Sequence, residues 1–492
     1  MKFYVTTPIY YVNDIPHIGH AYTTVAADVL ARYKRRQGFE VFFLTGTDEH
    51  GQKVYDAALA RDKKPQEFVD ELVLRFKAAW EKLNISNDDF IRTTEPRHKK
   101  VVRDIFSKLI AQGDIYKGEY EGLYCVTCEN FVTESSLKED LEGRKLCPVC
   151  GKETKTLKEE TYFFKLSKYQ DRLLRHIEEN PDFILPVSRR NEIINFIKQG
   201  LRDLSVTRTA FSWGINLKED PKHVVYVWFD ALINYVSAAP DGFWPADVHL
   251  MGKEIVRFHA VTWPCMLMAA DLPLPKTVFG HGWWTVEGKK MSKSVGNVVD
   301  PLALADQFGT DAVRYFLMRE VPFGADGDFS MEAFKARYNS DLANDLGNLL
   351  HRTLNMIEKY CESKIQNPKS VRAGHCPAPT IQILNEETPK RVEEAMAKLQ
   401  FSDALTAIWE LISTANRYIE EEAPWKLAKE NEERLKEVLF NLASALLTIA
   451  EQISPFMPET SAKMLEQLNI SGGKIAGTIV KKGNPLFPRL EK

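Results

Sequence analysis

The first fifty residues follow a strand–helix–strand pattern, which sharply limits the folds open to this chain. Residues 3–6 predict a buried strand and residues 41–44 predict a second, while the helix between them begins near His17 and ends at Gly38. This order of elements is typical of a parallel sheet. Because ligands bind outside the carboxyl ends of the strands in such sheets, we expect a site where Asp48 follows the second strand.

A loop that contains Pro8 and Pro16 leads into the helix, whose first turn carries two histidines. His17 and His20 lie three residues apart and therefore on one face of the helix. Helix N-termini favour anions, and histidine ring nitrogens can donate hydrogen bonds to phosphate oxygens. Gly19 would let a flat base approach the backbone. Two such histidines on their own would more often cap a helix or pack in a core.

A second polar string, Lys-Met-Ser-Lys-Ser, lies far along the chain at residues 290–294. Its lysines, Lys290 and Lys293, are flanked by Gly288 and Gly296, which suits a loop that closes over phosphates, although alone it would be an ordinary surface loop. Together with the histidines, it indicates an enzyme that activates a carboxylate with ATP. The chain has no GxxxxGK[ST] string and no GxGxxG after its first strand, which argues against a P-loop nucleotidase and a dinucleotide-dependent dehydrogenase.

Four of the seven cysteines form two Cys-x-x-Cys pairs, Cys125 with Cys128 and Cys147 with Cys150. This spacing predicts one tetrahedral zinc ion held by four thiolates. Because cysteine would fill all four positions, we expect the zinc to be structural. A pair of redox dithiols is the alternative, but the thioredoxin-like context that it needs is missing. Cys265 reads as a small core residue.

The length of 492 residues predicts several domains, and the pattern changes along the chain support this. Strands and helices give way to cysteine knuckles and charged turns, then resume, and the last part is helical. The predicted fold is therefore α/β followed by α: a Rossmann-like nucleotide-binding domain split by a zinc-binding connective insertion, then a helical bundle. The predicted segments are 1–118 (first half), 119–208 (insertion), 209–285 (second half), 286–340 (the lysine loop and a following region) and 341–492 (bundle and tail).

Apolar residues repeat at spacings of three and four in three segments, 342–357, 404–415 and 435–453, and each predicts a helix with one buried face. A loop rich in proline and polar residues, 367–379, lies between helices. We expect the final segment, 472–492, to pack back onto the body of the protein.

Composition restricts the class of protein without identifying a function. The chain is 44% hydrophobic and 27% charged, with no apolar run of eighteen residues, so we expect no membrane span. Its start lacks the features of a signal peptide, and the cytoplasm is the expected compartment. A net charge of −3 excludes a wholly basic surface but allows a nucleic acid to bind one positive face.

Five residues are candidates for binding an amino acid. Tyr11, Trp228, Tyr235 and His281 are predicted close to strand ends, where they could line an apolar pocket for a thioether side chain, or could be ordinary core residues. Asp48 could bind an ammonium group, or could cap the helix that follows it.

The two signature strings resemble those of class I aminoacyl-tRNA synthetases. Five further strings extend a resemblance to the methionyl-tRNA synthetase family, in its bacterial form with a single four-cysteine knuckle, over essentially the whole chain. They occupy residues 7–13, 45–51, 226–231, 252–254 and 423–425.

The resemblance implies a role for each matching residue. His17 and His20 would stabilise the α-phosphate of ATP, and Lys290 and Lys293 would hold the triphosphate and the leaving pyrophosphate. Further ATP contacts would come from Gly19, Gly252 and Glu254, the last at a position where the family often has aspartate. The methionine site would comprise Ile9, Tyr11, Asp48, Trp228, Ala231, Tyr235 and His281, and the anticodon would be read by Asn348, Arg352 and Trp425.

The resemblance also implies the reaction and the partners. Methionine and ATP would give methionyl-adenylate and pyrophosphate, with magnesium bridging the phosphates, and a ribose hydroxyl of methionine tRNA (anticodon CAU), initiator or elongator, would then take the methionyl group. No DNA or membrane partner is expected. Some family members end in a fused tRNA-binding β-barrel domain, whereas this sequence stops soon after Pro488, so we expect a monomer or a catalytic subunit with a separate tRNA-binding chain.

Several other functions remain open at this point. Synthetases for leucine, isoleucine or valine carry a larger editing insertion, and a cysteine-specific enzyme would use a metal in its substrate pocket. A non-catalytic tRNA-binding protein could keep the helical domain, but the intact histidines and lysines argue against it. A zinc-dependent regulator is a weaker alternative, because the knuckle is a small part of the chain.

Overall fold

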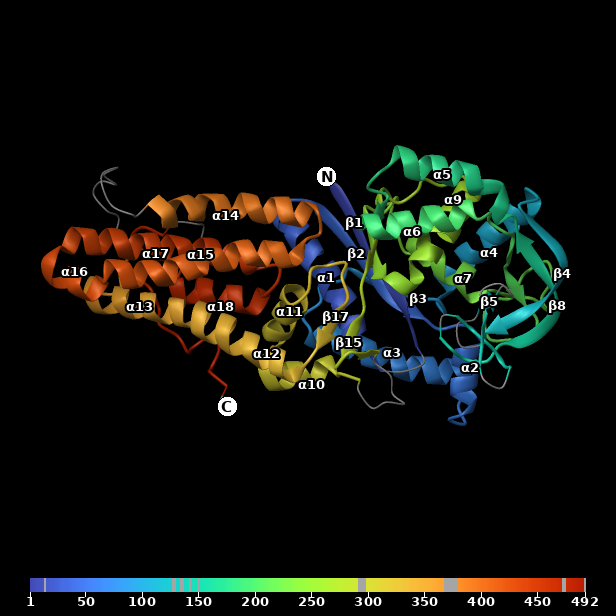
Figure 1. Cartoon of the computed structure of the whole chain (residues 1–492), viewed down its shortest axis with the longest axis horizontal. Helices are drawn as coiled ribbons and strands as arrows, with labels where there is room; N and C mark the ends of the chain where they lie inside the picture. The colour runs from blue at the N-terminus through green and yellow to red at the C-terminus, as the bar shows by residue number, and fades with distance from the viewer. Residues whose placement is uncertain are drawn as a thin grey trace. The chain divides into compact units, whose positions relative to one another are not determined.

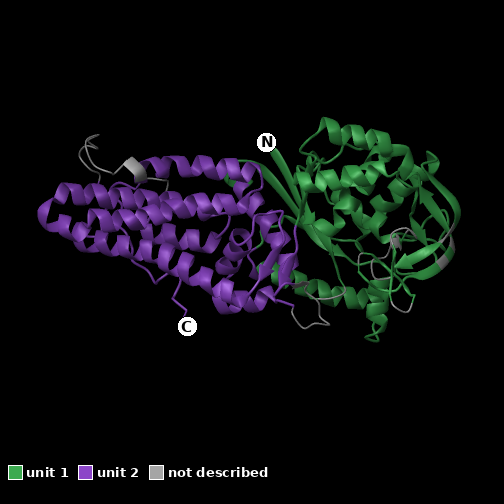
Figure 2. Cartoon of the chain, viewed as in Figure 1, with its two compact units in different colours: residues 1–16, 34–81, 85–281 green, residues 17–33, 82–84, 282–492 purple. Residues whose placement is uncertain are grey.

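The computed structural model describes residues 1–12, 15–125, 130–132, 137–140, 143–148, 150–290, 298–366, 379–470 and 475–490 (Figure 1). The chain divides into two compact units (Figure 2). Unit 1 comprises residues 1–16, 34–81 and 85–281, and unit 2 comprises residues 17–33, 82–84 and 282–492.

Unit 1 is built on a six-stranded sheet in the order β3-β2-β1-β13-β14-β9, and every neighbouring pair in it is parallel. This confirms the predicted parallel α/β architecture. Strands β2 and β3 lie on one side of β1, and β13 and β14 lie on the other. The switch point of the sheet, where ligands bind in open parallel sheets, is therefore between β1 and β13. The strands are β1 (Lys2–Tyr11), β2 (Glu40–Asp48), β3 (Asp89–Arg92), β9 (Ile184–Leu185), β13 (Val248–Gly252) and β14 (Thr277–His281).

The first strand is longer than the sequence predicted. We expected a loop from Pro8 onward, but β1 continues to Tyr11, which pairs with Asp48 at the end of β2. The register between the two strands shifts between Thr6 and Ile9, at Pro8. Proline has no N–H to give to the ladder, so a strand can contain it where pairing is interrupted. The strand therefore carries Tyr11 to the carboxyl edge of the sheet.

A second sheet in unit 1, in the order β10-β8-β4-β5, is dominated by the long antiparallel pair β4 and β8. Strand β9 lies inside the segment predicted as an insertion, yet it pairs with β14 at the edge of the parallel sheet. The domain boundaries given above stay predictions. The remaining strands of unit 1 are β4 (Ile115–Cys125), β5 (Asn130–Val132), β6 (Lys138–Glu139), β7 (Lys145–Leu146), β8 (Lys155–Phe164), β10 (Leu204–Ser205), β11 (Thr207–Arg208) and β12 (Val224–Val225).

One hydrophobic core joins the sheets of unit 1 to its helices. It includes Leu44 and Ile91 from the parallel sheet, Phe106 from α4 and Trp263 and Cys265 from α9, so Cys265 is the core residue that the sequence predicted. The helices of unit 1 are α2 (Gln52–Leu59), α3 (Pro65–Lys82), α4 (Pro96–Ala111), α5 (Gln170–Glu179), α6 (Val187–Lys198), α7 (Val227–Leu232), α8 (Asn234–Ser237) and α9 (Trp263–Ala270).

Unit 2 combines most of α1 (Ile18–Arg36), which joins β1 to β2 in sequence, with a small sheet and a helical bundle. The sheet has the order β16-β15-β17. Its strands are β15 (Trp284–Val286), β16 (Lys289–Lys290) and β17 (Gly327–Phe329). The helices that follow are α10 (Pro301–Phe308), α11 (Thr310–Arg319), α12 (Met331–Arg337), the π-helix η5 (Tyr338–Gly347), α13 (Asn348–Cys361), α14 (Pro379–Ala397), α15 (Phe401–Glu422), α16 (Pro424–Glu430), α17 (Glu432–Ile453) and α18 (Pro458–Leu468).

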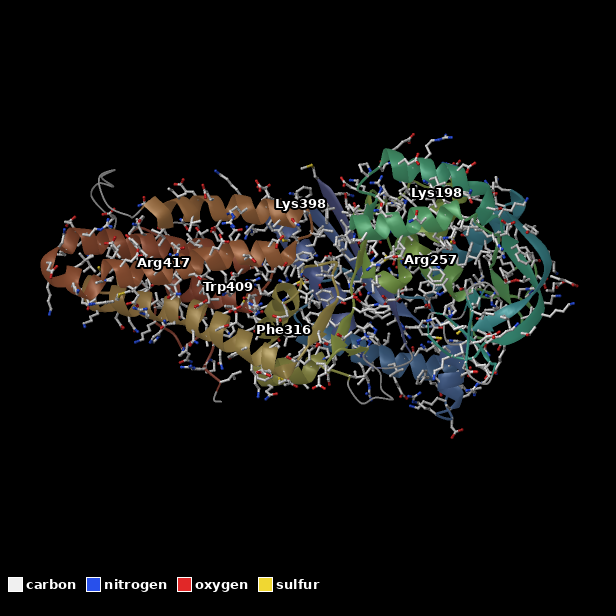
Figure 3. All side chains as sticks on the ribbon, in the orientation of Figure 1. Lys198, Arg257, Phe316, Lys398, Trp409 and Arg417 are labelled. Carbon is white, nitrogen blue, oxygen red and sulfur yellow. The ribbon has the colours of Figure 1, made fainter. Side chains whose placement is uncertain are left out.

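The three predicted stripes lie on helices of this bundle: 342–357 on η5 and α13, 404–415 on α15, and 435–453 on α17. Two core aromatics are labelled in Figure 3: Phe316, whose ring lies 5.0 Å from that of Phe334, and Trp409, whose ring lies 4.4 Å from that of Tyr315. The predicted loop 367–379 lies outside the described residues, apart from Pro379 at the start of α14.

The final segment returns to the bundle, as predicted. The Ile365 N–H donates to the Thr478 carbonyl oxygen at 2.8 Å, and the rings of Tyr338 and Phe487 lie 5.8 Å apart. Among the helices that the structure describes, none is long and apolar enough to cross a membrane.

Candidate functional site

The two histidines of the first signature stand at the start of α1, in unit 2. Their rings are stacked, with centroids 3.8 Å apart. The His17 N–H donates to Nδ1 of His20 at 3.2 Å, and the Gly19 N–H donates to Nδ1 of His17 at 3.1 Å. Each ring therefore accepts a backbone hydrogen bond at Nδ1, and a neutral ring must carry its proton on Nε2.

Electrostatics keep at least one of these rings neutral. Burial, and to a smaller extent the neighbouring His17, lowers the pKa of His20 well below its usual value. A neutral His20 with its proton on Nε2 is a hydrogen-bond donor that carries no charge. The first turn of α1 thus places such a donor at the positive end of a helix dipole, an arrangement suited to phosphate oxygens.

The second signature begins on a tight hairpin in unit 2. Strand β15 pairs with β16, so that Thr285 lies opposite Lys290. Glu287 and Gly288 form the turn with φ values of 51° and 71°, the left-handed pair that two-residue hairpins require. The turn is held by Asp328, whose Oδ1 accepts from the Gly288 N–H at 2.9 Å. The hairpin fixes the backbone at Lys290, and Lys293 lies outside the described residues.

The chain beyond the second signature returns to the histidine helix. The Ile18 N–H at the start of α1 donates to the carbonyl oxygen of Val299 at 3.1 Å. A residue within the first signature string is therefore joined directly to the chain that follows the second string, within unit 2, although the two are far apart in sequence.

In unit 1, the carboxyl edge of the parallel sheet brings together several predicted ligand residues. Tyr11 pairs with Asp48 at the ends of β1 and β2, and Gly252 pairs with His281 at the ends of β13 and β14. Tyr11 and His281 thus lie at strand ends, as expected, and Ile9 lies two residues before Tyr11 on β1.

Asp48 does not cap the helix that follows it. The residue that precedes α2 is Gly51, with a φ of 101°, and no side chain caps this helix. The Asp48 side chain is instead buried at the end of β2. The next residue, Glu49, is held in place because Nε of Arg92 donates to its Oε1 at 2.6 Å and the Thr47 hydroxyl donates to the same atom at 2.8 Å.

Three pocket candidates lie on helices, and for Trp228 and Tyr235, which were predicted close to strand ends, the prediction was wrong. Trp228 and Ala231 belong to α7, and Tyr235 belongs to α8. The preceding residues 224–225 do form a strand, but it is short and pairs with β11 outside the parallel sheet. Apolar runs of this length read equally well as strand or helix, and here the tertiary context selects the helix. Trp228 is half-buried and stacks on Phe258 with ring centroids 3.9 Å apart.

A hydrogen-bond chain fixes the Tyr235 hydroxyl. Nδ1 of His259 donates to the Ile255 carbonyl oxygen at 2.9 Å, so Nε2 accepts from the Tyr235 hydroxyl at 2.7 Å. Burial lowers the pKa of His259 to about 4, which keeps this ring neutral, and burial also raises the pKa of Tyr235 far above its usual value. The Tyr235 hydroxyl therefore donates its proton in the hydrogen bond to His259.

A buried cluster formed by His50, His98 and Asp230 was not identified from the sequence. Nδ1 of His50 and Nε2 of His98 lie 2.6 and 2.7 Å from the two carboxylate oxygens of Asp230. Burial alone would raise the pKa of Asp230, but the two histidines lower it to about 2, so the group is a carboxylate. Two of its members could have been found from the sequence, because His50 lies in the same string as Asp48 and Asp230 lies in the same string as Trp228.

The nucleoside candidates Gly252 and Glu254 follow the end of β13. A methyl group added at Gly252 would lie 2.5 Å from a carboxylate oxygen of Glu254, which is at the far end of an exposed side chain that can move aside. Glu254 is exposed, on the short 3₁₀ helix η3 (Lys253–Ile255).

Three of the four candidate metal ligands lie together. The sulfur atoms of Cys125, Cys147 and Cys150 are all within 4.8 Å of one another, and those of Cys125 and Cys150 are 3.4 Å apart. Thiolates about 2.3 Å from one tetrahedral metal ion would be separated by roughly 3.8 Å, so the three residues fit such an ion. None of them forms a disulfide. Cys128 lies outside the described residues.

The three anticodon candidates lie in the bundle of unit 2. Asn348 and Arg352 are four residues apart on α13, and Arg352 forms an ion pair of 2.6 Å with Glu420 near the end of α15. Trp425 follows on α16 and is 41% exposed, so it is not the core residue that its type would suggest. The Arg352–Glu420 pair thus places α13 beside the chain segment that leads to Trp425.

Comparison with known families accounts for both units. The model described as tRNA synthetases class I (M) matches residues 3–354. A second model, described as the anticodon binding domain of methionyl tRNA ligase, matches residues 368–481. The chain belongs to the methionine–tRNA ligases, in class I of the tRNA synthetases.

Individual methionine–tRNA ligases are similar over nearly the whole chain. The enzyme of Caldanaerobacter subterraneus is 56% identical, with 99% of this chain and 79% of the relative covered. The enzyme of Bacillus subtilis is 52% identical, with 99% and 78% covered. Among solved structures, Mycobacterium tuberculosis methionyl-tRNA synthetase in complex with methionyl-adenylate matches with a TM-score of 0.95 and 42% identity, covering 99% of this chain and 100% of that one.

These similarities confirm the predicted fold class and the predicted activity. The chain is an aminoacyl-tRNA synthetase, and its reaction is the ligation of methionine to tRNA. The alternatives of a leucine-, isoleucine-, valine- or cysteine-specific enzyme, a non-catalytic tRNA-binding protein and a zinc-dependent regulator are thereby excluded.

Proposed function

We propose that this methionine–tRNA ligase works by positioning and electrostatics, with the named residues in the following roles. A carboxylate oxygen of methionine attacks the α-phosphorus of ATP, the bond to the bridging oxygen breaks, and pyrophosphate leaves. The 2′-hydroxyl of the terminal adenosine of tRNA then attacks the carbonyl carbon of the adenylate, and AMP leaves. Neither step needs a covalent enzyme intermediate, so the protein contributes orientation and stabilisation of charge.

In the first step, His17 and His20 would donate from Nε2 to the oxygens of the α-phosphate, where negative charge builds up. What supports this role is their Nδ1 atoms, which are occupied by backbone N–H groups and so direct the ring protons to Nε2. This observation carries the proposal. Lys290 and Lys293 would balance the charge of the leaving pyrophosphate, and Gly19, Gly252 and Glu254 would contact the nucleoside.

For the amino acid, we assign the ammonium group to Asp48, a buried carboxylate at the end of β2. The thioether pocket would be formed by Ile9, Tyr11, Trp228, Ala231, Tyr235 and His281. All seven belong to unit 1, and four of them stand on strands that end at one sheet edge.

For tRNA, we assign anticodon recognition to Asn348, Arg352 and Trp425. An exposed tryptophan can stack on an unpaired base, while an amide and a guanidinium can read base edges. The partners are therefore ATP, methionine and a methionine tRNA with a CAU anticodon, initiator and elongator alike. We place the reaction in the cytoplasm, with the chain as a monomer or joined to a separate tRNA-binding chain.

Two metals complete the proposal. Zinc would be held by Cys125, Cys128, Cys147 and Cys150 and would stabilise the fold locally, because four thiolates leave no open coordination position. Magnesium would enter with ATP and reduce repulsion among the phosphates.

The proposal is tested by ATP–pyrophosphate exchange with each of the twenty amino acids, in the absence of tRNA. We expect exchange with methionine, and His17→Ala and His20→Ala should each reduce its rate while leaving the melting temperature unchanged. Exchange with another amino acid in place of methionine would overturn the pocket assignment. Unchanged rates in both histidine variants would overturn their role.

A further inference from the structure

The buried cluster around Asp230 has a position that bears on the methionine site assigned above. Asp230 stands on α7 between Trp228 and Ala231, two residues of the assigned thioether pocket. His50 stands two residues beyond Asp48, the assigned ammonium ligand. The bond between His50 and Asp230 therefore joins the two halves of the amino-acid site across 180 residues of sequence.

The cluster is shielded from water. His50 is 1% exposed, and Asp230 and His98 are both fully buried. Hydrogen bonds to a buried carboxylate are stronger than those between neutral groups, and removing one partner leaves an uncompensated charge. The geometry of the cluster is therefore expected to be stiff.

The third member anchors the other two to the scaffold. Nε2 of His98, on α4, donates to Asp230, and Nδ1 of His98 lies 2.8 Å from the hydroxyl of Ser237 on α8. The Asp230 carboxylate and its two histidines thereby link the end of β2 to α4, α7 and α8.

Two further hydrogen bonds hold the backbone of Glu49 and His50 in place. The Tyr11 hydroxyl donates to the His50 carbonyl oxygen at 3.1 Å. Nε1 of Trp213 donates to the Glu49 carbonyl oxygen at 2.6 Å, and the Trp213 ring packs edge-on against the His50 ring at 5.5 Å. With the backbone of residues 49 and 50 held in this way, the side-chain bond to Asp230 connects the end of β2 to α7.

We propose that His50, Asp230 and His98 form a positioning network for methionine binding, which holds the Asp48 carboxylate at a fixed separation from the thioether pocket on α7. This inference rests on the proposed function, since it takes Asp48 and the pocket as the two contacts of the substrate. The three residues act through Asp48, Trp228 and Ala231. The network makes the site selective for an amino acid whose ammonium group and side chain are separated as in methionine.

The two histidines contact Asp230 through different ring nitrogens, and this permits a sharp test. The amide nitrogen of asparagine occupies roughly the place of Nδ1, and that of glutamine roughly the place of Nε2. His50→Asn and His98→Gln should therefore keep the bond to Asp230, whereas His50→Gln and His98→Asn introduce the same groups in the wrong place. Asp247→Ala serves as a control for Asp230→Ala, because Asp247 precedes β13 at the opposite edge of the same sheet and accepts from the Tyr4 N–H at 2.7 Å.

The measurement is the KM for methionine, the KM for ATP and kcat in ATP–pyrophosphate exchange, with the melting temperature of each variant. We expect His50→Gln, His98→Asn and Asp230→Ala to raise the KM for methionine about ten- to a hundredfold, with the KM for ATP within about twofold of the wild type. His50→Asn and His98→Gln should stay within about threefold of the wild-type KM for methionine, and Asp247→Ala should lower only the melting temperature.

Equal effects of matched and mismatched amides, or equal increases in both KM values, would overturn the network and leave the cluster a structural one. Should Asp230→Ala fail to fold, the four histidine variants decide the matter. Failure of the proposed function gives a different result, because wild-type protein would then show no methionine-dependent exchange at all.

Discussion

At the scale of single residues, backbone contacts decide which atoms can take part in chemistry. His17 and His20 each have one ring nitrogen occupied by a main-chain N–H, so the remaining nitrogen of a neutral ring is a donor. Tyr235 shows the opposite case, since its hydroxyl proton is committed to His259 and only its oxygen lone pairs stay available. None of this is visible in the sequence, which gives the residue types without their partners.

We expect His20→Ala to slow adenylate formation by about a hundred- to a thousandfold, because one preorganised donor to a developing charge contributes about that much. His20→Gln, which keeps a donor near the place of Nε2, should recover part of the rate. Single-turnover formation of methionyl-adenylate measures the step directly. Wild-type rates for the alanine variant would refute the role.

The pH dependence gives a second measurement on the same residue. Because the pKa of His20 lies well below its usual value, the ring is neutral between about pH 6 and pH 8. Lowering the pH from 8 to 6 should therefore not change the exchange rate through His20. A rate that falls over this range in the wild type, but not in His20→Gln, would contradict the assignment.

At the scale of elements, strand ends and helix starts carry the candidate site. Strand β1 continues past Pro8 to Tyr11, and α7 replaces an expected strand at Trp228. The two differences have separate causes: β1 tolerates Pro8 because its pairing with β2 is interrupted there, whereas a short apolar run such as the one at Trp228 fits either a strand or a helix until its tertiary contacts decide. The metal cluster likewise depends on β4, which delivers Cys125 to Cys147 and Cys150.

We expect Cys147→Ser to release the metal ion and to expose the β4–β8 region to limited proteolysis, because a missing thiolate opens the coordination sphere. Metal content by atomic emission, together with mass spectrometry of the proteolytic fragments, measures both effects. Cys265→Ser changes a buried core cysteine and should leave the metal content unchanged. Undiminished zinc in Cys147→Ser would refute the site.

We expect Trp425→Ala to raise the KM for tRNA in aminoacylation roughly tenfold, while methionine-dependent pyrophosphate exchange stays at the wild-type rate. Loss of stacking on a single base has about this effect. Trp409→Ala is the informative comparison, because Trp409 is only 6% exposed and its loss should destabilise the bundle. If Trp425→Ala lowers the melting temperature as much as Trp409→Ala, Trp425 is structural.

At the scale of the whole molecule, one buried arginine joins distant parts of unit 2. Arg314 on α11 forms an ion pair of 2.7 Å with Asp28 on α1, and both side chains are fully buried. The same guanidinium donates to the carbonyl oxygens of Leu83, Pro455 and Phe456. The helix that begins with the signature histidines is thereby attached to the segment before α18 of the bundle.

We expect Arg314→Met to lower the free energy of unfolding by about 3–5 kcal/mol, since it removes one of the two arginines that pair with the buried Asp28 and also removes the donor to three buried carbonyl oxygens. Arg391→Met, which breaks an ion pair between half-exposed partners on the bundle surface, should cost at most about 1 kcal/mol. Urea unfolding followed by circular dichroism compares the two variants. Equal losses would mean that the buried pair contributes no more than a surface pair.

The sequence by itself determined the order of elements, the family resemblance, the cysteine spacing and the helical stripes, because these are properties of neighbouring residues and of periodicity. The comparisons confirmed the fold class and the activity. The roles of the individual site residues and the domain boundaries stay predictions.

Only the tertiary structure decided which side chains meet. The sequence places His50 and Asp230 in two separate strings and His98 outside all of them, and nothing local indicates that the two histidines share one buried carboxylate. The physical reason is that burial and hydrogen-bond partners are set by contacts between segments far apart in the chain. Those contacts fix tautomers, lower or raise pKa values, and so select which of the many polar residues can act on a ligand.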